Sequence, residues 1–366
     1  MKKLLAASLL ISAVLGASSC KEEVDLIGDF KETAIVYGLL DQSDSVHMIK
    51  IMRAFVGPGN AEDIAQISDS NYFQSVDAVV SEIMNGLVTR TWTLQDTIIT
   101  DKDPNGAFFA PDQKLYFFET SPSAPLDPNA TYHLAIDIDN GKFKVEGETG
   151  IVDGLSSGIS NQNTQFKFVT DPAEYTSQAI YVNTGNSYVV NTRVRTHFNE
   201  HIGATSTPTS FDWNIGESPT TPGSQISFSA NGETFYQLLA DKCSQGDPSV
   251  DKRSFNSFEI TITAGAEELY NYMLVNEPSS SLAQSKPTYT NLTATNDFGV
   301  VGIFSSRQTL KIDKPFFVSA AQAYIRAIDK KSTSELCIGP ITGPYFFCSH
   351  HPGDNVLGSE EPYACQ

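Results

Sequence analysis

The fold is decided first by residues 76–94, which read VDAVVSEIMNGLVTRTWTL. Two runs rich in β-branched side chains, Val76 to Ile83 and Leu87 to Leu94, flank the dipeptide Asn85-Gly86. A two-residue hairpin turn of this kind needs positive φ at both central positions, and Asn and Gly tolerate it. The stretch therefore predicts an antiparallel β-hairpin.

Strand-like runs extend on both sides of this hairpin. Asn140-Gly141 supplies a second hairpin turn of the same type, and Ala61 to Ile67 has the composition of a short helix. The further strands are predicted at Ala34 to Leu40, His47 to Arg53, Tyr132 to Ile138 and Lys142 to Glu146. This part of the chain is therefore predicted to be mainly β.

The segment Leu126-Asp127-Pro128-Asn129-Ala130-Thr131-Tyr132 indicates how these strands are arranged. It resembles the turn into strand F of fibronectin type III domains, where a Tyr hydroxyl bonds back to the backbone in a tyrosine corner. The resemblance implies an immunoglobulin-like or fibronectin-III-like β-sandwich over residues 33–150.

A second β-rich domain is expected over residues 151–366. The run Gly150 to Asn163 is rich in Gly, Ser and Asn and predicts a boundary. Two short helices are predicted at Glu233 to Asp241 and Ala266 to Val275, and Thr205 to Gly223 is predicted to be largely loop around a short strand. Seven strands are predicted at Gln165 to Val169, Gln178 to Val182, Ser187 to Phe198, Gln225 to Ser229, Phe258 to Thr263, Gly299 to Ser305 and Ala323 to Ile328.

The N-terminus has the pattern of an export signal. Lys2 and Lys3 precede an apolar run from Leu4 to Leu15, and small residues lead to Cys20. The run is shorter than the roughly 20 residues that a spanning helix needs. Residues 1–19 are therefore predicted to be a lipoprotein signal peptide, with Cys20 as the lipidated residue that attaches the protein to a membrane.

The residues after Cys20 indicate a destination. Lys21, Glu22 and Glu23 resemble the export signal of Bacteroidota lipoproteins on the outer face of the outer membrane, within a tether of residues 20–32. The chain has 24 Lys and Arg against 43 Asp and Glu, a formal net charge of −19. Such an acidic surface argues against a nucleic-acid partner.

Four cysteines besides Cys20 are candidates for disulfides: Cys243, Cys337, Cys348 and Cys365. An even number in an exported chain favours two disulfides, for which three connectivities are open. Three of the four lie in a C-terminal segment rich in Gly and Pro, so a crosslink is expected to restrain that tail.

Two short motifs are candidates for metal sites. His197-Phe198-Asn199-Glu200-His201 fits the H-x-x-E-H spelling of inverted zinc peptidases, but the alternation before it predicts a strand. In a strand the two histidines lie about 13 Å apart, too far for one zinc ion. In Cys348-Ser349-His350-His351, disulfide formation competes with metal binding. No metal site and no cofactor is predicted.

The second half of the chain resembles a large family of Bacteroidota surface lipoproteins. The family shares a domain of unknown function and is often encoded near TonB-dependent outer-membrane transporters. The resemblance is carried by Arg193 to Glu200, Phe211 to Gly216, Glu233 to Leu239, Leu269 to Tyr272, and Asn291-Leu292 followed by Phe298 to Phe304. It implies a β-rich surface lipoprotein and supplies no catalytic residues.

Three functions follow as hypotheses. The first is a non-enzymatic binding or accessory lipoprotein on the cell surface, working with an outer-membrane transporter or a surface ligand. The second is a hydrolase that acts on glycan or peptide, and the third is an adhesin or a structural protein of the envelope. The anchor and the sandwich-like strand pattern favour the first.

Overall fold

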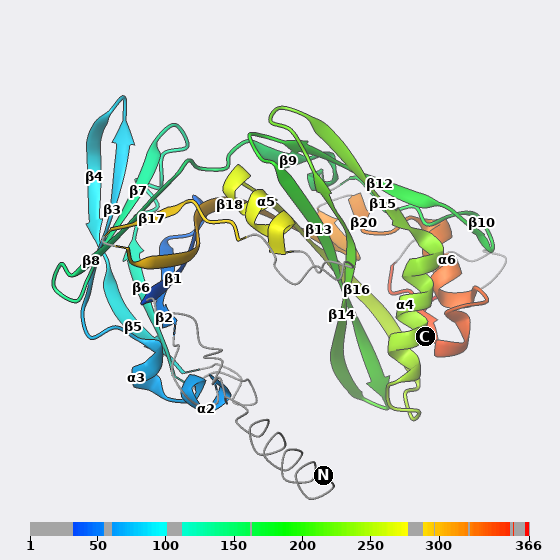
Figure 1. Cartoon of the computed structure of the whole chain (residues 1–366). Coiled ribbons are helices and arrows are strands. Elements are labelled where there is room, and N and C mark those ends of the chain that lie inside the picture. The colour runs from blue at the N-terminus through cyan, green and yellow to red at the C-terminus, as the bar shows by residue number, and fades with distance from the viewer. Residues whose placement is uncertain are drawn as a thin grey trace, which may run out of the picture.

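The structure is a computed structural model that describes residues 32–54, 61–100, 112–161, 163–276, 288–295, 297–320, 323–351, 354 and 363–365. It is mainly β with a few helices, which confirms the predicted fold class. Figure 1 shows two lobes, joined near the top of the view by β18 and α5.

The N-terminal lobe is a sandwich of two sheets that enclose one apolar core. The first sheet has the order β18 (Gly299–Pro315), β1 (Thr33–Leu40), β2 (Val46–Ala54), β6 (Gln113–Glu119) and β5 (Gln95–Ile99). The second has the order β17 (Leu292–Ala294), β8 (Phe143–Thr149), β7 (Thr131–Ile138), β3 (Val76–Met84) and β4 (Leu87–Thr93). Two short helices, α2 (Ala61–Ala65) and α3 (Ser68–Asn71), follow β2.

The predicted local signals of this lobe are confirmed. Asn85 and Gly86 have φ values of 52° and 78°, and the turn joins β3 to β4. In the tyrosine corner, the Tyr132 hydroxyl accepts a hydrogen bond from the Asp127 backbone N–H at 2.6 Å. The same hydroxyl donates to Glu82 Oε2 at 2.7 Å, so the corner is also bound to β3, the neighbouring strand in the same sheet.

The C-terminal lobe has a larger and a smaller sheet around a second core. The larger sheet has the order β14 (Thr205–Pro219), β13 (Val189–Ile202), β16 (Lys252–Gly265) and β18, and β21 (Phe347–Cys348) also pairs with β16. The smaller has the order β15 (Gln225–Asn231), β12 (Ser177–Thr184) and β9 (Leu155–Ser157). The remaining strands and 3₁₀ helices are β10 (Val169–Asp171), β11 (Glu174–Tyr175), β19 (Phe317–Ala320), β20 (Ala323–Arg326), η1 (Gly158–Ser160) and η2 (Gly343–Tyr345).

Three helices belong to the later part of the chain: α4 (Gly232–Ser244), α5 (Glu267–Asn276) and α6 (Lys330–Ile338). Asn231 caps α4 by accepting a hydrogen bond from the Thr234 N–H at 2.9 Å. The helices predicted near Glu233 and Ala266 are therefore present. Helix α6, capped by Asp329 in the same way, was not predicted.

The prediction of a loop over Thr205 to Gly223 is wrong for most of this segment. Residues Thr205–Pro219 form β14, which pairs with β13 along its whole length. This strand lies at the edge of the sheet, where Pro208 loses no ladder hydrogen bond. Pairing with β13 outweighs the turn-like composition of the segment.

Strand β18 crosses from one lobe to the other. Its first half, Gly299 to Ser306, pairs in parallel with β1, and its second half, Arg307 to Pro315, pairs antiparallel with β16. Leu292, Phe298 and Phe304 thereby enter the N-terminal core. The predicted boundary at residue 150 places all of β18 in the second domain. The sequence gives no sign of its return to the first, because a parallel pairing between distant segments leaves no local signal.

Helix α5 lies where the lobes meet. The Tyr272 and Tyr37 hydroxyl oxygens are 2.9 Å apart, and burial followed by this hydrogen bond raises the pKa of Tyr37 to about 12. Ser305 Oγ, on β18, donates to Glu268 Oε2 at 3.3 Å. Side chains of α5 therefore contact β1 and the half of β18 that pairs with β1.

Candidate functional site

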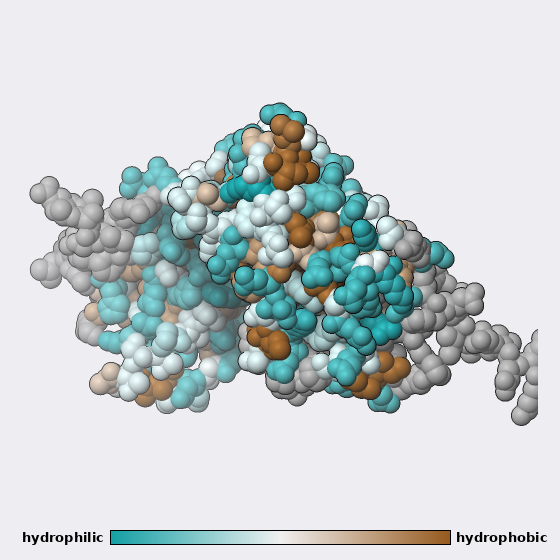
Figure 2. Space-filling view, turned by 90° about the vertical axis from the view of Figure 1, so that its left-hand side faces the viewer, coloured by the Kyte–Doolittle hydropathy of each residue, from teal (hydrophilic) through white to brown (hydrophobic). Residues whose placement is uncertain are grey.

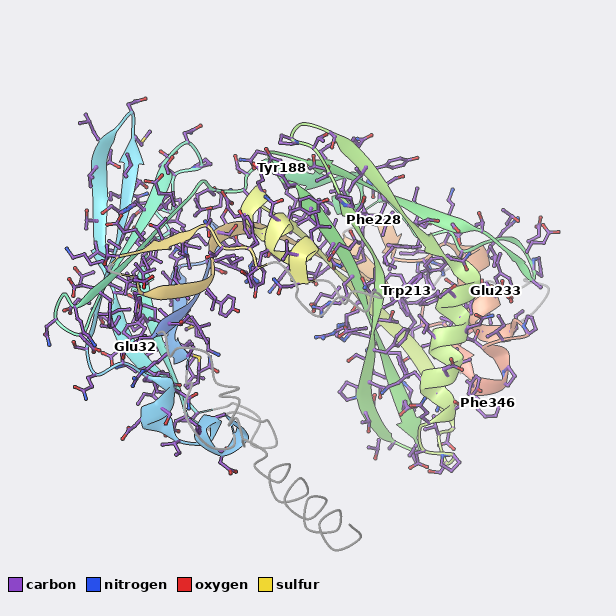
Figure 3. All side chains as sticks on the ribbon, in the orientation of Figure 1. Glu32, Tyr188, Trp213, Phe228, Glu233 and Phe346 are labelled. Atoms are coloured by element: carbon purple, nitrogen blue, oxygen red, sulfur yellow. A yellow bond between two sulfur atoms is a disulfide. The ribbon has the colours of Figure 1, made fainter. Side chains whose placement is uncertain are left out.

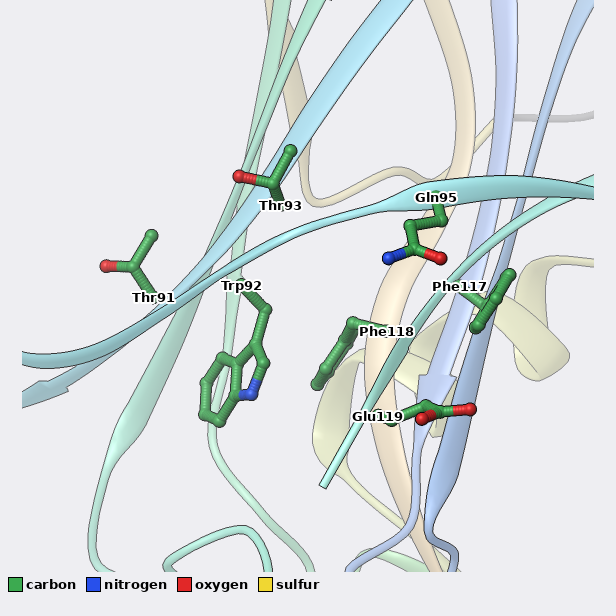
Figure 4. Close-up of a pocket in the computed structure, with 7 residues that line it drawn as sticks. All are labelled: Thr91, Trp92, Thr93, Gln95, Phe117, Phe118 and Glu119. Carbon is green, nitrogen blue, oxygen red and sulfur yellow. The ribbon is translucent and has the colours of Figure 1, made fainter. Parts of the chain in front are cut away.

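The candidate site is a pocket on one side of the N-terminal sandwich. The chain leaves β4 at Thr93, at the edge of one sheet, and enters β5 at Gln95, at the edge of the other. Leu94 between them is buried, and its N–H donates to the Ala78 carbonyl at 2.9 Å. The pocket has a volume of about 390 Å³ and is lined by Thr91, Trp92, Thr93, Gln95, Phe117, Phe118 and Glu119 (Figure 4).

Its apolar wall is held by ring contacts. The Trp92 and Phe118 ring centroids are 5.1 Å apart, and Phe118 stacks on His47 at 4.7 Å. The Arg90 guanidinium lies over the Trp92 ring, 4.9 Å from its centroid. These neighbours fix the orientation of the indole and of the Phe118 ring.

Arg90 is itself fixed by a buried carboxylate. Its Nε donates to Glu82 Oε1 at 2.9 Å, and its Nη1 donates to the Ala124 carbonyl at 2.8 Å. Burial alone raises the pKa of Glu82, but hydrogen bonds from Arg90, Tyr132 and Thr89 outweigh it and lower the pKa to about 2. Glu82 therefore stays charged and connects the tyrosine corner to the wall of the pocket.

The polar side chains of the pocket are Gln95 and Glu119, which are exposed to solvent, and Trp92, which is half-buried. In Figure 4 the indole nitrogen lies on the edge of the ring that faces Phe118, and the Gln95 amide points toward the same space. The pocket thus has an aromatic wall and an exposed polar rim.

The sequence did not single out this pocket. Its residues come from two segments, Thr91 to Gln95 and Phe117 to Glu119, which the Gln95–Phe117 pairing of β5 and β6 brings together. The only local signal was Trp92 among exposed Thr residues in an edge strand. No spacing rule joins such a residue to a Phe-Phe-Glu run more than twenty residues later.

A second hollow of about 840 Å³ lies beside Glu32 and Arg53. Glu32 forms ion pairs with Arg53 at 3.1 Å and with Lys142 at 3.0 Å. Glu32 is labelled in Figure 3, above the short helices of its lobe. These ion pairs connect the residue before β1 to β2 and to the turn before β8, so the hollow is lined by groups that hold the strands together.

The H-x-x-E-H segment lies in β13, which confirms the predicted strand. His197 Nε2 is 3.8 Å from Glu259 Oε2, whereas His201 Nε2 is 3.0 Å from Ser254 Oγ. Glu200 accepts a hydrogen bond from Arg253 Nε at 2.9 Å. The three motif residues therefore have different partners and do not converge.

The tail cysteines form one disulfide, Cys348–Cys365. The second predicted disulfide is not present, because Cys243 near the end of α4 and Cys337 on α6 are free and buried. Burial raises the pKa of the Cys243 thiol to about 12 and shifts Cys337 in the same direction. Both therefore remain protonated and inert thiols.

His350 lies against His201, with ring centroids 6.4 Å apart. Among the described residues, no group of three His, Cys, Asp or Glu side chains could hold a metal ion. In that same part of the chain, no helix has the length and apolarity needed to cross a bilayer. Cys20, Lys21, Glu22 and Glu23 lie outside the described residues.

Comparison of the chain with models of known families and with curated proteins gives no match. Among solved structures, the chain is similar to the C-terminal globular domain of an oligosaccharyltransferase from Pyrococcus abyssi, with 11% sequence identity and a TM-score of 0.22. The match covers 60% of this chain and 43% of that one, so this chain spans less than half the length of that structure. A likeness at this TM-score carries no argument about function.

Proposed function

We propose that the protein is a non-enzymatic binding lipoprotein of the Bacteroidota cell surface. Lipidated Cys20 anchors it to the outer membrane, and Lys21, Glu22 and Glu23 direct it to the external face. Its role is to capture a surface ligand, or to assist an outer-membrane transporter, through the pocket at Trp92. The observation that carries the proposal is the pocket itself, which has an aromatic wall at Trp92 and Phe118 and the exposed polar side chains of Gln95 and Glu119 at its rim.

The position of the pocket suits an anchored binder. On β2, Ala54 pairs with Thr33 next to the tether, and Val46 pairs with Glu119 of the pocket. Eight residues of strand separate these points, which is about 27 Å. The pocket therefore lies well away from the attached end, and twelve residues of tether before Glu32 extend its reach by up to about 40 Å.

The surface around the pocket supports contact with a partner. In Figure 2, which faces the outer side of the N-terminal lobe, hydrophilic side chains dominate, and hydrophobic ones gather at the highest point. The β3–β4 hairpin lies there in Figure 1, and its residues Leu87 and Val88 are 71% and 61% exposed. An apolar hairpin tip on an otherwise polar face is typical of a small contact surface.

Anchoring and surface exposure are tested together in cells. Wild-type protein is expected to incorporate labelled fatty acid and to be cleaved by protease added to intact cells. Cys20→Ala should abolish lipid incorporation, and replacement of Lys21, Glu22 and Glu23 by Ala should retain the lipid but protect the protein from protease. Full protection of the wild type would contradict the surface location.

Binding is tested by co-purification from native membranes with mass spectrometry. The pocket variant Gln95→Ala/Glu119→Ala is compared with Gln237→Ala/Glu233→Ala on α4, which removes the same two residue types from the other lobe. We expect a surface partner or ligand with the wild type and the α4 variant, and its loss with the pocket variant. Equal recovery with all three proteins would remove the pocket from the function.

A further inference from the structure

We infer that His47 is a positioning residue of the Trp92 pocket, and that its protonation weakens binding there in mildly acidic surroundings. This inference rests on the proposed function, because it names the regulation of the same pocket. It follows from a row of packed rings that ends at His47, from the burial of that imidazole and from the polar atoms around it.

The aromatic wall of the pocket is the middle of a row of four rings. His47 stacks on Phe118 with ring centroids 4.7 Å apart, Phe118 lies 5.1 Å from Trp92, and Trp92 stacks on Tyr132 at 6.4 Å. His47 and Phe118 are partners in the β2–β6 register, whereas Trp92 and Tyr132 belong to β4 and β7 of the second sheet. The row therefore crosses the sandwich, and Figure 4 shows its two middle rings, Trp92 and Phe118, in the pocket.

The two ends of this row are held differently. The Tyr132 hydroxyl is fixed by Glu82 Oε2 at 2.7 Å and by the Asp127 N–H at 2.6 Å. Burial raises the pKa of Tyr132 above its ordinary value, so this end does not change charge near neutral pH. At the other end, His47 Nε2 lies 3.1 Å from Thr120 Oγ1, and His47 Nδ1 is buried with no hydrogen-bond partner among the described residues. His47 is therefore the end that can titrate near neutral pH.

The place of the His47 imidazole suits only its neutral form. The residue is 2% exposed and lies on the same face of β2 as Ile49, which belongs to the core of the N-terminal lobe. Protonation puts a hydrogen on both ring nitrogens, so Nδ1 would become a buried donor without an acceptor. It would also place a full charge inside the sandwich, which is costly.

The charged groups around the ring do not reverse this balance. Burial lowers the pKa of His47 below its ordinary value of 6.5 and outweighs the attraction of Asp44 and Asp41, which lie between β1 and β2. On β6, Glu119 follows Phe118 in the strand and so points to the opposite face of the sheet. From β4, the Arg90 guanidinium lies over the Trp92 ring and is paired with a carboxylate of its own lobe.

Protonation therefore changes the wall of the pocket. The imidazolium gains hydration only by leaving its place, and Phe118 then loses the ring on which it stacks. Because Phe118 packs against Trp92, neither ring keeps a fixed orientation. One pH unit below the titration midpoint of His47, only about a tenth of the molecules retain the neutral ring, so the apparent affinity of the pocket falls about tenfold.

An NMR titration tests this coupling without any partner. The full processed chain carrying Cys20→Ser is labelled with ¹³C at histidine Cε1 and with ¹⁵N at the tryptophan indole, and spectra are recorded from about pH 7.5 to about pH 4.5. His47→Phe and Trp92→Phe assign the two resonances. We expect His47 to titrate with a midpoint below 6.5 and the Trp92 indole N–H resonance to move with the same midpoint.

Variants separate this titration from other effects of pH. His47→Phe keeps a ring for stacking, and His47→Gln keeps a polar group near Thr120, so both should abolish the movement of the Trp92 resonance at the His47 midpoint. The control His133→Gln removes another histidine of the same lobe, whose Nε2 lies 3.9 Å from Glu146 Oε2, and should leave that movement unchanged.

Two outcomes of the titration would overturn the inference. The first is a Trp92 resonance that does not follow His47 in the wild type, or that still moves at the same pH in His47→Phe. The second is a His47 midpoint above 6.5, which would mean that Asp44, Asp41 and the face of the Phe118 ring hold the imidazolium in place. The wild-type titration gives this answer even where a variant fails to fold.

Binding is then compared at two pH values with native membrane extract as the probe. The wild type should bind its partner about tenfold more weakly one pH unit below the His47 midpoint than one pH unit above it, and His47→Phe should bind equally at both. Pocket-dependent binding that is the same at both pH values would overturn the inference and leave the proposed function standing. Binding that does not depend on the pocket at either pH would instead remove the proposed function, so the two failures are distinguishable.

Discussion

Among single residues, Glu82 connects the most features of the N-terminal lobe. Its side chain is 4% exposed, and it accepts hydrogen bonds from Tyr132 and Thr89 as well as from Arg90. Tyr132 belongs to the tyrosine corner, and Arg90 lies over Trp92 of the pocket. A buried carboxylate is retained here because three donors satisfy it.

The lowered pKa of Glu82 predicts a pH dependence. The folded pKa of about 2 lies below the ordinary value of 4.5, so its stabilisation is full above 4.5 and is lost as pH falls toward 2. Glu82→Gln cannot titrate and should be less stable than the wild type at pH 7. We expect the difference in their free energies of unfolding, measured in urea, to shrink between pH 4.5 and pH 2.5. A constant difference would show that Glu82 is not held as an ion.

The structure predicts which cysteines are free thiols and which are crosslinked. Unfolded but unreduced protein should react with a thiol reagent at Cys243 and Cys337 and not at Cys348 or Cys365, because only the latter pair is crosslinked. Peptide mapping by mass spectrometry checks this in the Cys20→Ser chain. Four labelled cysteines would refute the disulfide, and none would establish a second one.

At the scale of elements, the sequence predicts what short-range physics determines. Asn85-Gly86 adopts positive φ at both positions, and Tyr132 bonds back to Asp127, because both depend on a few neighbouring residues. Strand β14 was missed because its stability comes from β13. For the same reason the pocket was missed, since β5 and β6 create it only when they pair.

Strand β18 contains the glycine on which the crossing depends. Gly302 has a φ of 104°, and a Cβ at this position would overlap the Val36 carbonyl oxygen. Gly302→Ala should therefore lower the free energy of unfolding by ~2 kcal/mol or more. The control is Gly150→Ala, where a Cβ meets no atom within 4 Å. Urea unfolding followed by fluorescence measures both, and equal stability of the two variants would contradict the close approach.

The C-terminal tail is held by the disulfide and by a buried ion pair. Asp354 is bound by Arg326 and also accepts hydrogen bonds from Ser349 and Tyr363. The disulfide closes a separation of 17 residues, so Cys348→Ser/Cys365→Ser should lower stability by ~3 kcal/mol. The loss should affect unfolding of the C-terminal lobe, reported by Trp213. Unfolding of the variant at wild-type urea concentrations would show that the ion pair alone suffices.

At the scale of the whole molecule, the lobes are not successive segments of chain. Residues 292–306 return to the N-terminal sandwich, where β17 pairs with β8 and β18 pairs with β1. The sequence indicates two β-rich units from composition and turns, but it does not show which segment completes which core. That assignment depends on contacts between residues more than a hundred positions apart.

This connectivity predicts how the protein can be divided. A fragment of residues 33–150 lacks Leu292, Phe298 and Phe304, whose side chains are buried in its core, and it exposes the edges of β1 and β8. It should not unfold cooperatively on its own. The same fragment joined to residues 288–306 by a flexible linker should do so, as measured by urea unfolding followed by fluorescence. If residues 33–150 alone unfold as cooperatively as the linked form, β18 only connects the lobes and is not required to complete the N-terminal one.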